Sequence, residues 1–304
     1  MDNSMKYWLL VAAFLILLGM AFLVAAMYIC NWDLSGLGTT VYESETYEFS
    51  GNISDISIQT DTADIVFAAA ADGKTKVVCL EQNNLKHNVL LQDGKLTILP
   101  VDERNWYDHI GINFGHPQIT VYLPEEEYGC LSVTSDTADV TIPKDFSFHK
   151  AEIRASTGKI TVEDITVGEL DVCVSTGTAT VANVTCEKTV NIDVTTGKVK
   201  LMDIQCENLV STGSTGDLLL ERVMVTETIS VERNTGNVKF EECDAGELMI
   251  STTTGDVTGS FLSEKRFIAE TSTGRIDVPQ GTNGGNCCIS TNTGDIRIKL
   301  SSEA

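Results

Sequence analysis

The stretch from Asn191 to Leu201 reads NIDVTTGKVKL, and its Thr-Gly pair recurs throughout the second half of the chain. Successive copies of the pair are separated by 19 or 20 residues. A period of this length indicates a stack of similar structural units, each of which contacts only its neighbours. The pairs are Thr157-Gly158, Thr176-Gly177, Thr196-Gly197, Thr215-Gly216, Thr235-Gly236, Thr254-Gly255, Thr273-Gly274 and Thr293-Gly294.

Each pair is flanked by alternating apolar and polar residues, which is typical of half-buried β-strands. In the quoted stretch, Val199 and Leu201 follow the pair with Lys200 between them. Hairpins in a barrel would tolerate variable spacing, whereas parallel coils about 4.8 Å apart need a nearly constant length. We therefore predict an all-β fold, a parallel β-solenoid (β-helix) of about 20-residue coils, with two strands joined by a turn at each pair. We also expect the stacked threonine hydroxyls to hydrogen-bond along the column.

The repeat weakens towards the N-terminus. Ala138 precedes Gly158 by 20 residues and lies in phase, whereas Ala63 is out of phase. Asp93-Gly94 predicts a β-hairpin. We predict an irregular β cap over residues 45–135 and regular Thr-Gly repeats over residues 136–304. The polar residues expected to cover the far end of the stack are Lys299, Ser301, Ser302 and Glu303.

The N-terminal segment is a separate unit. From Tyr7 to Ile29 the chain carries no charged residue, and a helix of that length, at about 1.5 Å per residue, can span a membrane. The apolar run is longer than that of a cleaved signal peptide, so a retained anchor is favoured and a signal peptide is the alternative. Lys6 precedes the run and acidic residues follow it, which places the N-terminus in the cytoplasm. We predict a cytoplasmic tail (1–6), a single transmembrane helix (7–29), a linker (30–44) and an extracytoplasmic solenoid.

Composition restricts the partners and cofactors. The formal net charge is −22, which disfavours nucleic acid and anionic lipid headgroups as partners. The nine cysteines match no zinc-site spacing, so we expect no metal site and no cofactor, although weak calcium binding by the acidic surface stays open. Cys186 and Cys206 each lie nine residues after a repeat glycine, and they should stack in adjacent coils as free thiols or as a disulfide.

Candidate functional residues are few. Asp217, Asp256 and Asp295 each follow a repeat glycine, but their repeats are not consecutive, so we expect no catalytic acid pair. An aromatic-rich segment interrupts the repeat and suits a recognition loop. The alternative is a hairpin that packs on the end of the solenoid. The candidate recognition residues are Trp106, Tyr107, His109, Phe114 and His116.

The sequence resembles the DUF4097 family, the β-strand-repeat "putative adhesin" proteins of bacteria. The resemblance covers about residues 45–300 and is carried by the Thr-Gly-Asp/Lys-Val column, by Ile119–Pro124 (ITVYLP) and by Leu131–Pro143 (LSVTSDTADVTIP). It implies a β-solenoid on the cell surface and supplies no catalytic residues. Alanine at positions 63 and 138 departs from the glycine that is usual in the family.

Together these observations predict a membrane-anchored extracytoplasmic protein that acts by surface binding or adhesion and is not an enzyme. Its expected partners are the membrane, through Tyr7–Ile29, and an envelope protein or glycan. One alternative is an accessory or sensory component of a bacterial envelope-stress system. A remote alternative is a carbohydrate-active enzyme.

Overall fold

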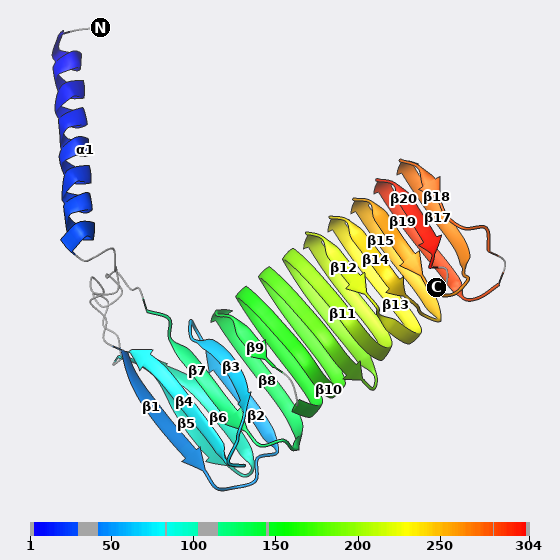
Figure 1. Ribbon diagram of the computed structural model, residues 1–304, viewed down its shortest axis with the longest axis horizontal. Helices are drawn as coiled ribbons and strands as arrows, with labels where there is room; N and C mark the ends of the chain where they lie inside the picture. The colour runs from blue at the N-terminus through cyan, green and yellow to red at the C-terminus, as the bar shows by residue number, and fades with distance from the viewer. Residues whose placement is uncertain are drawn as a thin grey trace.

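A computed structural model of the protein describes residues 3–29, 42–82, 84–102, 115–143, 146–281 and 283–301. In this part of the chain one helix precedes a continuous system of β-strands, which stack into an elongated domain (Figure 1). The fold is therefore all-β with one N-terminal helix. The elements are α1 (Asn3–Ile29), β1 (Tyr42–Phe49), β2 (Asp55–Thr60), β3 (Asp64–Ala69), β4 (Thr75–Gln82), β5 (Leu85–Gln92), β6 (Lys95–Asp102), β7 (Gln118–Leu123), β8 (Glu127–Thr137), β9 (Val140–Ile142), β10 (Phe146–Cys186), β11 (Thr189–Thr215), β12 (Leu218–Glu221), β13 (Met224–Thr235), β14 (Val238–Cys243), β15 (Glu247–Thr254), β16 (Val257–Phe261), β17 (Arg266–Thr273), β18 (Ile276–Asp277), β19 (Asn286–Thr293) and β20 (Ile296–Leu300).

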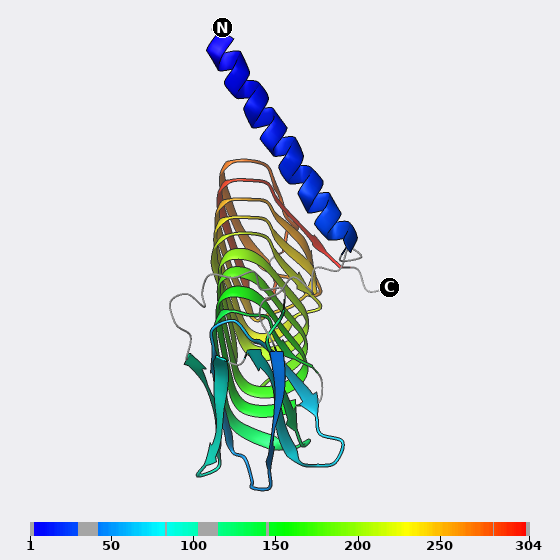
Figure 2. The same cartoon turned by 90° about the vertical axis from the view of Figure 1, so that its left-hand side faces the viewer.

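Successive coils of the repeat pair in parallel. Between β10 and β11, Gly177 lies opposite Gly197 and Val181 lies opposite Leu201, so the offset equals the 20-residue repeat read from the sequence. The pairings of β8 with β10, β11 with β13 and β14 with β16 are also parallel. The predicted parallel stacking is confirmed, and the coils lie behind one another when viewed along the stack (Figure 2).

The five coils from Gly158 to Gly236 also turn at a second corner, six residues after the glycine. Asn183, for example, has a left-handed backbone with φ of 52°, a conformation that Asn and Asp tolerate better than most residues. β10 continues through both kinds of corner, so the predicted pair of strands separated by a turn is too simple a description. The second-corner residues are Asp164, Asn183, Asp203, Arg222 and Glu242.

Apolar side chains from three runs in each coil fill the interior. In the coil of Gly177, the first run precedes the glycine, the second follows it, and the third follows the second corner. The same columns are buried in neighbouring coils, so the core is continuous along the stack. The inward-facing residues of this coil, each at most 4% exposed, are Val172, Val174, Ala179, Val181, Val184 and Cys186.

The glycine column brings the backbones of neighbouring coils into very close contact. Gly197 has φ of 147°, which other residues rarely adopt. A Cβ atom at this position would lie 1.6 Å from the carbonyl oxygen of Gly177. Glycine is therefore required for close approach as well as for conformation. Among the described residues no hydrogen bond joins the hydroxyls of the threonine column, so the expected threonine ladder is wrong.

The order of the coils in space differs from their order in the sequence at the C-terminal end. β19 lies between β15 and β17, and β20 lies between β16 and β18. After β16 the chain skips one layer, forms β17 and β18, and then returns to fill the gap (Figure 1).

The outermost coil is therefore β17–β18, and the expectation that the chain terminus covers the stack is wrong. Lys299 lies in β20, one layer inside the end, and the backbone N–H of Ser301 donates to the carbonyl of Phe261. Ser302 and Glu303 lie outside the described residues.

A similar insertion occurs at the N-terminal end. β2 lies between β6 and β8, and β3 lies between β7 and β9. Ile65 is opposite Val140, so the corner at Ala63 stacks on the corner at Ala138, and the interpretation of Ala63 as out of phase is wrong. Antiparallel strands β1, β4 and β5 lie at this end of the sheet, and the predicted hairpin at Asp93-Gly94 joins β5 to β6.

Most side chains of α1 are exposed over residues 6–29. Its segment Lys6–Ile29 has a mean hydropathy of 2.9 and is long and apolar enough to cross a membrane. A signal sequence would have the same features, so the helix alone does not decide between the two.

Replacing Gly197 with alanine should destabilise the stack, because the new Cβ would overlap the Gly177 carbonyl. We expect the free energy of unfolding to fall by about 3 kcal/mol or more, measured by urea denaturation. Gly73→Ala is the matched control, since φ is 68° there and no atom lies within 4 Å of the added carbon. It should cost about 1–2 kcal/mol. Equal losses in the two variants would contradict the role of close approach.

The coil order can be tested with pairs of cysteines in a Cys30→Ser/Cys288→Ser background. Ser251 is opposite Ser290, which is in turn opposite Glu270. A short thiol-reactive crosslinker should join the pair S251C/S290C, about 4.8 Å apart, and not S251C/E270C, about 10 Å apart. Coils stacked in sequence order would give the opposite result on a denaturing gel.

Candidate functional site

The aromatic segment predicted to recognise a partner lies mostly outside the described residues. Trp106, Tyr107, His109 and Phe114 fall between residues 102 and 115. His116 is described and is exposed to solvent just before β7. The recognition role of this segment stays a prediction.

A row of polar side chains runs beside the glycine column, at the residue that follows each corner. Where this residue is Asp or Asn, its side chain accepts a hydrogen bond from the backbone N–H of the next coil. At the N-terminal end this bond joins Asp64 to Asp139 and Asp139 to Lys159. Towards the C-terminal end, the acceptor and donor pairs are Asp217 with Asn237 (3.0 Å), Asn237 with Asp256 (2.9 Å), Asp256 with Asp295 (2.8 Å) and Asp295 with Arg275 (2.9 Å).

This row corrects the predicted separation of the three aspartates. Asp256 and Asp295 lie in adjacent coils, because the coil β19–β20 is inserted beside β15–β16. Oδ1 of Asp256 accepts the backbone N–H of Asp295 in the neighbouring coil, and Oδ2 accepts a hydrogen bond from Arg297 at 3.3 Å. The carboxylates therefore take part in the corner structure, where they satisfy backbone donors.

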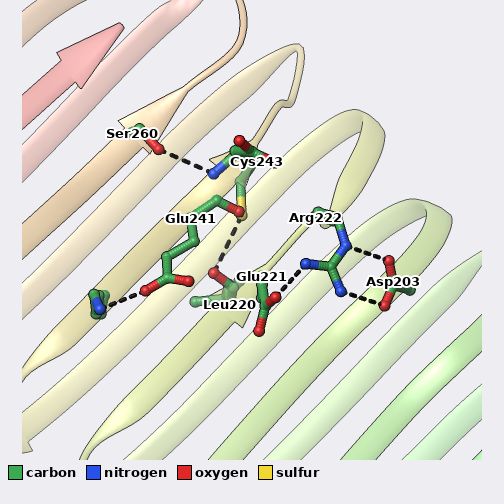
Figure 3. A network of polar contacts seen from close by, with 9 residues as sticks. Asp203, Leu220, Glu221, Arg222, Glu241, Cys243 and Ser260 are labelled. Carbon is green, nitrogen blue, oxygen red and sulfur yellow. Dashed lines mark hydrogen bonds and ion pairs between the residues drawn. The ribbon is translucent and has the colours of Figure 1, made fainter. Parts of the chain in front are cut away.

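Arg222 joins two coils at the second corner (Figure 3). Its Nε and Nη2 donate to the two carboxylate oxygens of Asp203 at 2.6 and 2.7 Å, and Nη1 contacts Glu221. Hydrogen bonding from Arg222 lowers the pKa of the Asp203 carboxyl. Because the pair is exposed, it fixes the geometry of the corner more than it adds stability.

The cysteines of the described residues are free thiols. Cys186 and Cys206 lie in adjacent coils as predicted, next to the opposed pair Thr185 and Gln205, and no disulfide joins them. Burial raises the pKa of Cys206 to about 12, which makes it a poor nucleophile at neutral pH. Cys288 is the exposed member of the set.

A buried polar cluster in the cap was not predicted. His87 Nδ1 lies 3.0 Å from Glu81 Oε2, and His87 Nε2 lies 3.1 Å from Thr60 Oγ1. The order of groups resembles the acid–histidine–hydroxyl relay of hydrolases. However, Thr60 Oγ1 also accepts the backbone N–H of Ala63 at 3.2 Å, and all three side chains are buried. We interpret the cluster as the internal support of the Ala63 corner.

Arg233 is a second unpredicted buried group. Its side chain points into the core, where Nη2 donates to Ser211 Oγ at 2.7 Å. Gly213 makes room for it, since a Cβ there would lie 1.9 Å from Arg233 Nη1. Burial lowers the pKa of Arg233 to about 10, so the guanidinium stays charged at neutral pH. Ser211 and Gly213 of the preceding coil thus leave room for the large guanidinium group of Arg233 in the next coil.

A shallow groove crosses the outer face of β13, β15, β19 and β17, near the C-terminal end of the stack. Its volume is about 490 Å³. Met249, Cys288 and Ile268 are opposite one another on successive strands and form an apolar row, and Met249 and Ile268 are each 50% exposed. Glu232, Glu247 and other polar residues also line the groove. The groove therefore has an apolar floor, formed by Met249, Cys288 and Ile268, and an acidic border that includes Glu232 and Glu247.

Comparison with known families identifies the fold. The sequence model of the family described as Toastrack DUF4097 matches residues 53–299. The chain belongs to the Toastrack DUF4097 family. The match includes the corner columns, the groove and most of the cap, so the domain with these features is the Toastrack domain. Among curated proteins, none matches the sequence.

Two solved structures share this Toastrack fold. One is a "putative adhesin" from Bacteroides fragilis, with 14% sequence identity and a TM-score of 0.51, and the match covers 85% of this chain and 97% of that one. The other is a "putative adhesin" from Parabacteroides distasonis, also with 14% identity and a TM-score of 0.51, and the match covers 86% and 98% of the two chains. At this identity the likeness concerns the fold alone.

The structural role of the aspartate row predicts different effects for two substitutions of Asp256. Asp256→Asn keeps an acceptor for the N–H of Asp295 and should leave stability nearly unchanged. Asp256→Ala removes the acceptor and should lower the free energy of unfolding by about 1 kcal/mol, measured by urea denaturation. Equal stability of the two variants would contradict this role of the carboxylate.

Proposed function

We propose that this protein is held in a membrane by α1 and binds a partner through the outer surface of its extracytoplasmic Toastrack domain. The anchor is supported by the length and hydropathy of Lys6–Ile29. Lys6 lies before the apolar run, and acidic Glu43 and Glu45 follow it, which favours a cytoplasmic N-terminus. The adhesin-like Toastrack proteins of known structure support a role in surface contact.

The apolar groove is the observation that carries the binding role. Half-exposed Met249 and Ile268 leave apolar surface in water, which a partner would cover with a gain in free energy. Because no aromatic ring lines the groove among the described residues, it offers no stacking platform for a sugar. A protein segment with an apolar side chain beside basic residues fits both the floor and the acidic border.

We assign no catalytic role. The aspartates beside the glycine column accept backbone hydrogen bonds, and the hydroxyl of the buried cluster in the cap also accepts a backbone N–H.

A binding experiment with the full chain tests this proposal. Spheroplasts of a bacterial host that express the Cys30→Ser variant should expose Cys288 to a membrane-impermeant maleimide, and the Cys30→Ser/Cys288→Ser variant should show the loss of that label. The purified protein in detergent should capture an envelope protein, and Met249→Glu should weaken that capture at least tenfold by placing a charge on the apolar floor.

The matched control is Val210→Glu, which lies in the same outward column two coils away. Capture that is lost equally in both variants would argue against the groove. Labelling of Cys288 only after lysis would argue against the extracytoplasmic location.

A further inference from the structure

The C-terminal end of the stack has an open edge. Among the described residues, β17 pairs with β19 on one side only, and β18 pairs with β20 on one side only. At the opposite end, antiparallel β4 covers β7 and antiparallel β5 covers β6. Unpaired edges are usually short, bulged or protected by charged side chains that point inward.

The open edge also leaves part of the core uncovered. Ile276 is 47% exposed, whereas Val257 and Ile296, which occupy the same column in the inner coils, are fully buried. Phe267 and Ala269 face inward from β17 and pack partly against the core, and Thr271 continues this inward column opposite the buried Thr291. Lys265, just before β17, is a buried charge, and its Nζ pairs with Asp244 and donates to the carbonyl of Ala245 in the inner coils. Within β17 itself the inward side chains carry no charge, and another layer would complete their burial.

The backbone of β17 shows which groups face the open side. The N–H of Arg266 donates to Gly285 at 2.9 Å, on the side of β19. Because backbone groups alternate along a strand, those of Ile268 and Glu270 also face β19, whereas those of Phe267 and Ala269 face outward. The outward donors and acceptors can pair with an added strand.

We propose that β17 pairs with β17 of a second copy of this chain, antiparallel and about a twofold axis at Ile268. In this register, Phe267 of each copy lies opposite Ala269 of the other copy, and the two residues form a hydrogen-bonded pair. Arg266 lies opposite Glu270 of the second copy, and the reciprocal pair repeats the contact. The exposed Ile268 side chains meet on the axis, beside the two grooves.

The charges of β17 select this register. A twofold axis at Ala269 would place Ile268 opposite Glu270 and would leave Arg266 opposite Ser272. The axis at Ile268 forms two pairs of opposite charge and one apolar pair, which are the cross-strand contacts that stabilise antiparallel strands. The edge is therefore complementary to itself.

A twofold contact at this end joins two stacks end to end, with the N-terminal ends pointing away from each other. This pairing depends only on the edge. With the membrane anchor of the proposed function, on which this last step rests, the two copies would belong to opposing membranes. The dimer would then be a homotypic adhesive contact.

Charge reversal tests the pairing with the purified full chain in detergent, by density-matched sedimentation equilibrium. Arg266→Glu and Glu270→Arg each place like charges opposite one another twice, and each should weaken dimerisation at least tenfold. The double variant restores opposite charges and should recover the wild-type affinity. Recovery also shows that neither new side chain prevents folding.

A crosslink tests the register. In a Cys30→Ser/Cys288→Ser background, Ile268→Cys places two thiols in a non-hydrogen-bonded pair, with Cα atoms about 4.5 Å apart, and should give an oxidised dimer. Ser230→Cys, in the same column three coils inside, should not.

A monomer at all concentrations, or a dimer unaffected by the single reversals, would overturn the proposal. So would failure of the double variant to recover affinity. Because dimerisation is measured without any other partner, it can fail while capture by the Met249 groove succeeds, and the reverse also holds.

Discussion

The close approach of glycine backbones from coil to coil is the constraint on which the rest of the structure depends. A Cβ atom on Gly197 would lie 1.6 Å from the carbonyl oxygen of Gly177, and one on Gly177 would lie 1.8 Å from that of Gly158. This contact fixes where each coil must return, and therefore fixes the coil length at 19 or 20 residues. The inward columns of the core and the hydrogen-bonded row from Asp217 to Arg275 follow from that register.

The sequence predicts the stacking well because its period records the register directly. It cannot predict the order of the coils, because each coil presents the same corner and similar apolar columns to both neighbours. Gly274 follows Gly255 by 19 residues whether its coil lies one layer or two layers away. The second corner is hidden for a different reason: the stack imposes the left-handed backbone on Arg222 as well as on Asn183, so no single residue type marks it.

The candidate sites show the same limit. Asp256 and Asp295 are 39 residues apart and become neighbours only because of the inserted coil. The buried cluster joins Thr60 to His87 across two strands that do not belong to one repeat, so no local sequence pattern predicts the contact. The apolar row of the groove combines strands β15, β19 and β17, so it also requires the spatial order.

The inserted coil has a consequence for how the chain reaches its native state. During synthesis, β17 emerges before β19, and at that moment the free edge of β15 is the surface that β19 will later occupy. β17 carries matching corner residues, so it can pair directly with β15. That arrangement competes with the native one until β19 and β20 are made. Correct assembly at this end therefore depends on the last strands to be made. When β19 inserts between β15 and β17, it separates two strand edges that could otherwise pair with each other.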